Sequence, residues 1–145
     1  MKTKRILGLA LSAAFALTTP ILHADEHKKV AEEHEEGGKM KIPETTEGIF
    51  KEIVTEQTEL KETIEAKKLA DVHHHAFSIR DLAAALPAKA AADKKAAVTA
   101  TSKNIAKLAG DLDEAGDGSN QAACEAGIKK MDALIKMLTG QFAAK

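Results

Sequence analysis

Histidine is the residue type in this chain whose chemistry and spacing point to a binding site. The sequence contains six histidines, and five of them form two groups. His27 and His34 lie seven residues apart among glutamates, and His73, His74 and His75 are consecutive. Imidazole nitrogens mixed with carboxylate oxygens suit Zn, Cu(II) or Ni better than metals that select thiolate ligands. The sequence therefore predicts that these two groups bind a divalent metal.

The three consecutive histidines do not form one site, because successive residues of a helix diverge by about 100°. Asp71 precedes His74 and His75 by three and four residues, so a pair of Asp71 with either histidine is expected on one helical flank. His27 and His34 would join that pair only where the N-terminal tail approaches this helix. The open alternative is a solvated helix face, with Asp71 in an ordinary surface ion pair and a tail that aids solubility.

The N-terminal end of the chain has the features of a secretory signal peptide. Lys2, Lys4 and Arg5 precede an apolar run over residues 6–17, and residues 22–24 end on a small residue that suits cleavage. The apolar run is too short for a permanent membrane anchor. We expect residues 1–24 to be removed, which leaves a periplasmic protein that is not membrane-embedded.

Composition divides the mature chain in two. Residues 25–44 have almost no large apolar side chain and many glutamates, which predicts a flexible, disordered acidic tail that contains histidine. Residues 45–145 are rich in alanine, leucine, isoleucine and lysine and lack Trp and Tyr, which favours helices.

Apolar residues at spacings of three and four predict helices over about residues 46–66, 69–86, 90–114 and 119–142. Connections this short make consecutive helices antiparallel neighbours. The predicted fold is therefore all-α, an antiparallel up-down four-helix bundle.

In such a bundle His75 is also a candidate for a buried polar layer. When each helix is reflected about its loop, Gln57, His75, Thr101 and Met131 fall near one level, with His75 level with about Ser102. In one interpretation His75 is a hydrogen-bonded buried histidine that sets the alignment of the helices. In the other, His75 and Met131 are ligands on diagonal helices for copper or a haem iron.

A candidate interaction surface lies on the second predicted helix. Phe77 points away from the main apolar stripe of that helix and lies close to His73 and Arg80. Two interpretations stay open, because a lone aromatic on an outer face has no single meaning. Either residues 40–43 fold back over Phe77, or Phe77 contacts a second copy of the chain or another protein.

Several function classes do not fit the sequence. A formal net charge of −1, more negative without the signal peptide, does not match a nucleic-acid binder. The single cysteine, Cys124, lies on an apolar stripe and is interpreted as a small buried hydrophobe, or as the link of a dimer if the helix end frays. The sequence has no nucleophile motif, phosphate loop, paired-Cys metal knuckle or HExxH. The carboxylates of the first and last helices are expected on solvent faces, so we expect no enzymatic activity.

The exported, Ala- and Lys-rich set of helices over residues 45–145 resembles the periplasmic four-helix cytochromes, of the c-prime type and the soluble b-type. The resemblance implies the architecture alone. The Cys-x-x-Cys-His run of the c-prime type has no counterpart around Cys124. The methionine on the first helix and the histidine on the last helix of the b-type are also missing, so no haem ligand carries over.

Three functional interpretations follow, of which we prefer the first. It is a small exported helical protein that binds or buffers Cu, Zn or Ni in the periplasm, through His27, His34 and the segment 71–75. The second is a non-catalytic structural or adaptor bundle that contacts another envelope protein or forms a homodimer. The third is an electron carrier that binds haem without a covalent link.

Overall fold

The computed structural model describes residues 40–143, and this part of the chain is all-α. Its four α-helices are α1 (Thr46–Glu65), α2 (Val72–Ala85), α3 (Lys95–Asp117) and α4 (Gln121–Ala143), and short 3-10 turns flank α2, η1 over Leu69–Asp71 and η2 over Leu86–Ala88. No β-strand occurs between residues 40 and 143. None of the helices in that range is both long and apolar enough to cross a membrane. The predicted signal peptide and the tail histidines His27 and His34 lie outside the described residues.

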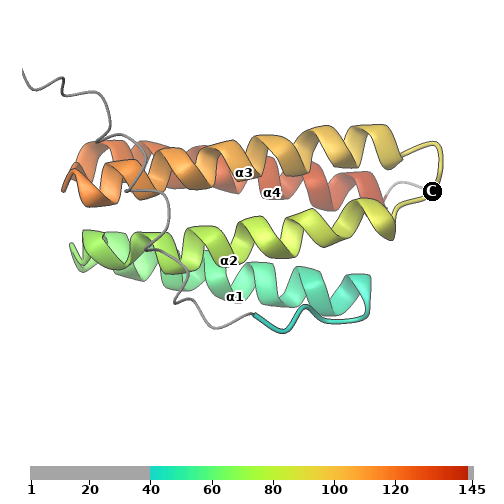
Figure 1. Ribbon diagram of the computed structural model, residues 1–145, viewed down its shortest axis with the longest axis horizontal. Helices are drawn as coiled ribbons and strands as arrows, with labels where there is room; N and C mark the ends of the chain where they lie inside the picture. The colour runs from blue at the N-terminus through green and yellow to red at the C-terminus, as the bar shows by residue number, and fades with distance from the viewer. Residues whose placement is uncertain (1–39, 144–145) are drawn as a thin grey trace, which may run out of the picture. The chain divides into compact units, whose positions relative to one another are not determined.

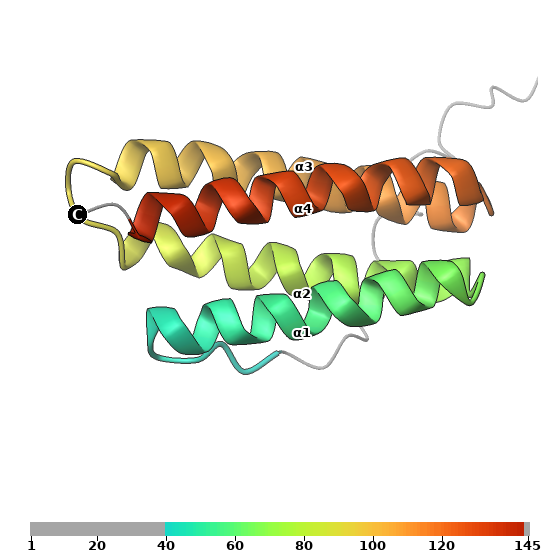
Figure 2. The same ribbon diagram turned by 180° about the vertical axis from the view of Figure 1, so that it is seen from behind.

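The four helices lie side by side, and consecutive helices run in opposite directions (Figure 1, Figure 2). Helices α1 and α2 lie below α3 and α4 in the view of Figure 1. Contacts join α1 to α2, α2 to α3 and α3 to α4, and α4 also packs against α1. Each helix therefore covers part of the apolar stripe of its neighbours.

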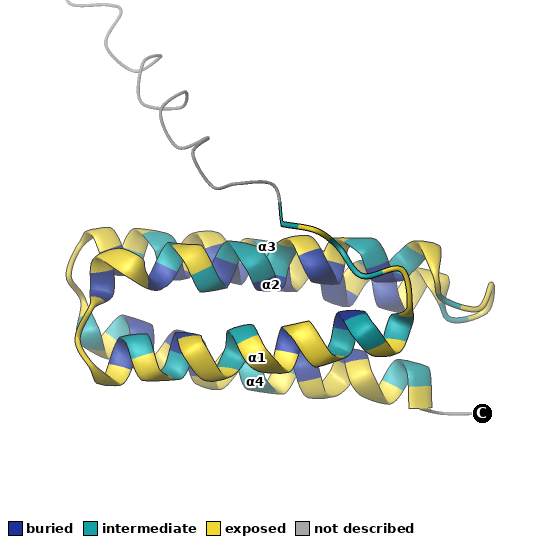
Figure 3. Ribbon diagram, turned by 90° about the horizontal axis from the view of Figure 1, so that it is seen from below, coloured by how far each residue is buried: buried dark blue, intermediate teal, exposed yellow. Residues whose placement is uncertain are grey.

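Buried residues recur along all four helices, between partly buried and exposed ones (Figure 3). Helix α1 contributes four of them at helical spacing, Ile49, Ile53, Leu60 and Ile64. The other helices contribute fully buried side chains that include Ile79, Leu82, Leu86, Ile105, Leu112, Met131 and Leu138. Burial of each such side chain stabilises the fold by about 1.5–3 kcal/mol, so the apolar core is the main source of stability.

Local capping determines where α1 begins and how the chain leaves it. The Gly48 N–H donates a hydrogen bond of 3.0 Å to Oγ1 of Thr45, which satisfies a free donor of the first turn. Beyond the helix, Lys67 adopts a φ of 58°, and the Lys68 N–H donates to the Thr63 carbonyl at 3.0 Å. A left-handed residue in this arrangement ends a helix sharply and turns the chain toward α2.

The connection between α2 and α3 is longer than the sequence pattern predicts. The helix predicted over residues 90–114 begins only at Lys95 and continues to Asp117. Before it, the N–H groups of Lys94 and Lys95 donate to the Ala91 carbonyl at 3.0 and 2.9 Å, in a turn. Residues 90–94 therefore belong to the connection that reverses the chain direction, although the alanines among them favour a helix.

Two further predicted boundaries differ from the structure. The helix predicted over residues 69–86 is divided into η1, α2 and η2. Pro87 lies in η2, where its missing N–H and fixed φ favour a short turn over a continuing α-helix. Helix α4 begins at Gln121 rather than at residue 119, because Ser119 adopts a left-handed φ of 51° in the turn after α3.

The longer connection displaces α3 along α2 relative to the predicted register. Ser102 Oγ donates a hydrogen bond of 2.8 Å to the Ala83 carbonyl, whereas reflection about the predicted loop places Ser102 level with His75. The difference is about two helical turns, or roughly 12 Å. A register derived from loop reflection is therefore wrong for this helix pair.

Two glycines allow the closest approaches between elements. A Cβ atom at Gly116 of α3 would lie 2.5 Å from the backbone oxygen of Leu69, and a Cβ atom at Gly127 of α4 would lie 2.5 Å from Cδ2 of Leu112. A leucine methyl group can move aside, but a backbone carbonyl in a packed turn cannot do so without shifting the chain. Gly116 is therefore the stricter requirement.

We predict that Gly116→Ala lowers the free energy of unfolding by about 1–3 kcal/mol, because the added methyl group overpacks the contact with η1. Gly110 is the matched control on the same helix, since its added Cβ would meet nothing within 4 Å. Gly110→Ala should raise stability by about 0.5–1 kcal/mol through helix propensity. Urea denaturation followed by circular dichroism measures both. Equal stability gains in the two variants would contradict the close approach at Gly116.

Candidate functional site

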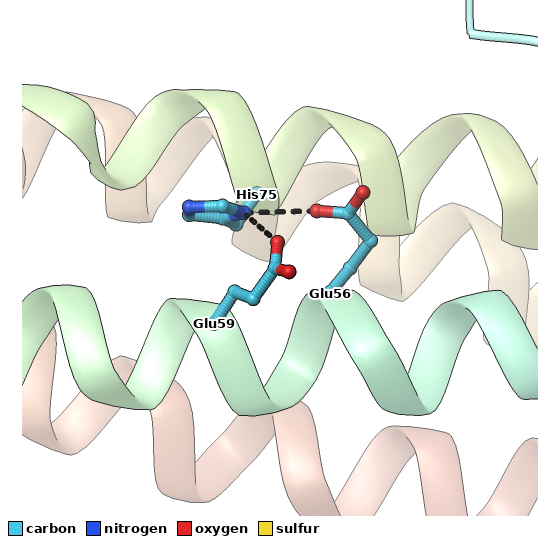
Figure 4. Close-up of side chains that lie close together, drawn as sticks. All are labelled: Glu56, Glu59 and His75. Carbon is cyan, nitrogen blue, oxygen red and sulfur yellow. Dashed lines mark hydrogen bonds and ion pairs between the residues drawn. The ribbon is translucent and has the colours of Figure 1, made fainter.

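Three side chains with metal-binding chemistry meet between α1 and α2 (Figure 4). Glu56 and Glu59 are three residues apart on α1, so their side chains project from one flank of the helix. His75 of α2 faces them, with Nδ1 at 2.9 Å from Oε2 of Glu56 and 3.3 Å from Oε2 of Glu59. One potential ligand atom from each residue lies within 4.8 Å of the other two. The two helices thus bring two carboxylates and one imidazole to one place.

The three side chains differ in burial. The exposed fractions are 15% for Glu56, 22% for His75 and 49% for Glu59. Glu56 and His75 are therefore held mostly within the seam between the helices, and Glu59 forms its solvent side. Because an ionised carboxylate only accepts hydrogen bonds, Nδ1 of His75 carries the proton and donates it toward the two glutamates. The group is satisfied internally and remains open to solvent on one side.

The spacing of the three donors fits a first-row divalent metal. In a tetrahedral zinc site with bonds of about 2.0–2.1 Å, neighbouring ligand atoms lie about 3.3 Å apart. The separations of 2.9 and 3.3 Å between Nδ1 of His75 and the two carboxylate oxygens lie close to that value. Three protein ligands leave at least one position for water, which is typical of sites that exchange ligands rather than of closed structural sites.

His75 contacts Glu56 and Glu59 in the structure, rather than Asp71 as the sequence predicts. Asp71 is exposed at the N-cap of α2 and makes no side-chain cap hydrogen bond. His74 is exposed, and its ring lies 3.9 Å from the ring of His73. The expectation that the carboxylates of α1 all face solvent is wrong for Glu56. This residue lies on the flank of α1 beside α2, where its contact with His75 leaves it mostly buried.

The residues of the predicted polar layer, Gln57, His75, Thr101 and Met131, do not meet at one level, because α3 is displaced along α2. Gln57 Nε2 donates to Oδ1 of Asp132, and Lys61 Nζ lies 3.0 Å from Oδ2 of that residue, so these groups join α1 to α4. Met131 is fully buried in the apolar core. His75 bonds to α1, as described above.

Thr101 lies away from that level. Its Oγ1 donates to the Ala97 carbonyl at 3.1 Å and accepts a hydrogen bond of 2.9 Å from Nε2 of Gln141. Gln141 is more than two helical turns beyond Met131 on α4. The placement of Thr101 in one layer with Gln57, His75 and Met131 is therefore wrong, because the loops around α3 do not lie where simple reflection puts them.

Other residues of the same chain cover part of the surface predicted around Phe77. Phe77 is partly buried and packs against the core cluster, as do Met40 and Ile42. The Cζ atom of Arg80 lies 4.4 Å from the centroid of the Phe77 ring, and the His73 ring centroid lies 6.2 Å from it. A guanidinium over an aromatic face is a favourable contact, so Arg80 covers part of the Phe77 ring.

Cys124 is fully buried on α4 and belongs to the apolar core. Burial of the thiol, and secondly the charge of the neighbouring Glu125, raise the pKa of Cys124 above its ordinary value. A protonated, buried thiol is a poor nucleophile, which supports a packing role.

We predict that Cys124 makes the fold less stable as the pH rises through the alkaline range. The unfolded thiol ionises at its ordinary pKa of about 9, at a lower pH than the folded thiol does. Above that pH, ionisation therefore stabilises the unfolded state relative to the folded state. The loss should continue until the raised pKa of the folded thiol is passed. Urea denaturation between about pH 8 and about pH 10.5 measures this slope. Cys124→Ala is the control, and an identical pH dependence in both proteins would contradict the prediction.

Comparison with protein-family models, with curated proteins and with solved structures finds no match for this chain. What the described residues share with the four-helix cytochromes is an all-α fold with four helices. Within residues 40–143, metal-ligating side chains meet at the cluster of Glu56, Glu59 and His75.

Proposed function

We propose that this chain is an exported periplasmic protein that binds or buffers a divalent transition metal, Cu, Zn or Ni, on an antiparallel up-down four-helix bundle. The observation that carries the proposal is the meeting of Glu56, Glu59 and His75 between α1 and α2. One imidazole nitrogen and two carboxylate oxygens are a donor set that these metals accept. The two carboxylates also balance the charge of a divalent ion.

Partial exposure supports reversible binding rather than a permanent structural role. Glu59 is about half exposed, so an ion reaches the cluster without unfolding of the core. Bound metal would join α1 to α2 and stabilise the folded state by RT ln(1 + [M]/Kd), about 2.7 kcal/mol at a hundredfold excess over Kd. Buffering needs this kind of accessible site and no catalytic group.

A second candidate function is a non-catalytic structural or adaptor bundle that contacts another envelope protein or a second copy of the chain. It is supported by the direct bonds of His75 to Glu56 and Glu59, which satisfy these groups without a metal. Haem binding has less support, since Nδ1 of His75 faces carboxylates and Met131 is enclosed in the apolar core.

We predict that mature protein, exported without an affinity tag and purified without chelator, binds about one Zn(II) or Cu(II) per chain, measured by isothermal titration calorimetry and elemental analysis. His75→Ala should weaken binding at least about tenfold because it removes the nitrogen ligand. Glu56→Gln should weaken it in the same direction.

His74→Ala is the matched control, since His74 is the exposed neighbour of His75 and lies outside the cluster. It should bind metal like the unmodified protein. Equal binding by His75→Ala would contradict the proposed site. Loss of binding only in a His27→Ala, His34→Ala variant would assign the metal to the tail instead. Absence of any uptake would favour the adaptor function.

A further inference from the structure

An open groove of about 300 Å³ lies between α1 and α4, away from the cluster of Glu56, Glu59 and His75. Helices α1 and α4 lie next to each other in Figure 2 and pack along one seam. Ile64 of α1 and Ile128 of α4 contribute the apolar part of the groove lining. Both isoleucines are buried by the core on their other side, with exposed fractions of 2% and 8%. The groove thus has an apolar floor.

Charged residues line this floor in two pairs of opposite sign. Lys61 and Glu65 are one helical turn apart on α1, and Glu125 and Lys129 are one turn apart on α4. Gln57 of α1 bonds to Asp132 of α4, and Gln121 of α4 bonds to the Ile64 carbonyl of α1, so residues 61–65 lie near the level of residues 125–129. Four residues of helix span about 6 Å. The Cα atoms of the two lysines are therefore offset from those of the two glutamates by about that length along the groove.

Lys61 is already held by an ion pair between α1 and α4, whereas the other three charged residues of the groove are not. Lys61 Nζ pairs with Asp132, at 3.0 Å, and no ion pair within the described range joins Glu65, Glu125 or Lys129 to a cation or carboxylate. Their helices already offer each a partner of opposite sign one turn away, yet the side chains stay apart. Glu65, Glu125 and Lys129 are consequently available to an added molecule that carries both charges.

Gln121 adds a polar group to the same groove. Its Nε2 donates to the Ile64 carbonyl at 3.0 Å and to Oε1 of Glu125 at 2.8 Å. Its own Oε1 is buried without a hydrogen-bond donor. A buried acceptor that lacks a donor is unfavourable. An ammonium group bound near Glu65 and Glu125 would supply that donor after a small rotation of the amide.

We propose that this groove binds a short aliphatic zwitterion whose ammonium and carboxylate are separated by about 6 Å. The carboxylate contacts Lys129, the ammonium contacts Glu65 and Glu125, and the methylene chain covers Ile64 and Ile128. A molecule with one charge satisfies only one end of the groove. Recognition therefore depends on both charges and on their separation.

The test uses mature, isotope-labelled protein and 5-aminopentanoate, whose extended chain separates its charges by about 6 Å. Backbone amide chemical shifts report binding residue by residue. We expect saturable shifts around residues 61–65 and 121–129. Pentanoate and pentylamine have similar chains with a single charge, and each should bind at least about fivefold more weakly.

Single substitutions distinguish specific binding from general attraction. Lys129→Gln and Glu65→Gln should each weaken 5-aminopentanoate binding by about three- to fivefold. Lys130→Gln and Glu62→Gln are matched controls, because both residues are exposed neighbours that do not line the groove, and they should leave the affinity unchanged. Absence of saturable shifts, equal binding of either singly charged compound, or equal losses in the control variants would overturn the proposal.

Discussion

Mutual coverage of four apolar stripes is the constraint on which the rest of this structure depends. No disulfide occurs within residues 40–143, whose one cysteine is free, and the chain has no Trp or Tyr to enlarge a small core. Stability must come from aliphatic side chains that each helix buries against the others. In the described core, only Thr101 and Ser102 are buried polar residues, and the other buried side chains there are apolar.

Polar groups with binding potential are consequently confined to the edges of the seams between helices. Tight seams leave them little room: Gly127 of α4 approaches the side chain of Leu112 so closely that a Cβ atom would collide with it. The seam between α1 and α2 admits His75 and two glutamates. The seam between α1 and α4 leaves an open groove. Differences in side-chain size along the stripes thus decide where a ligand is able to approach.

The sequence predicts the helices and much of their buried face, because helical periodicity is a local property. Ile49, Ile53, Leu60 and Ile64 recur at the spacing of one helix face, and all four are buried. It also indicates that His75 points inward on a flank. It does not identify Glu56 and Glu59, since a glutamate facing a neighbouring helix has the same local pattern as one facing water. Only the pairing of α1 with α2 separates the two cases.

The register between α1 and α2 depends less on contacts distant in the sequence than the register between α2 and α3 does. The turn after α1, with Lys67 in the left-handed conformation, is short, so reflection about it places Glu56 within about one turn of the level of His75. The connection before α3 includes η2 and a further turn, and reflection there fails by about two turns. The cluster of Glu56, Glu59 and His75 therefore lies within one hairpin of helices. Its geometry is determined mainly by the length of a single local turn, and the remaining two helices contribute by burying the opposite faces of that hairpin.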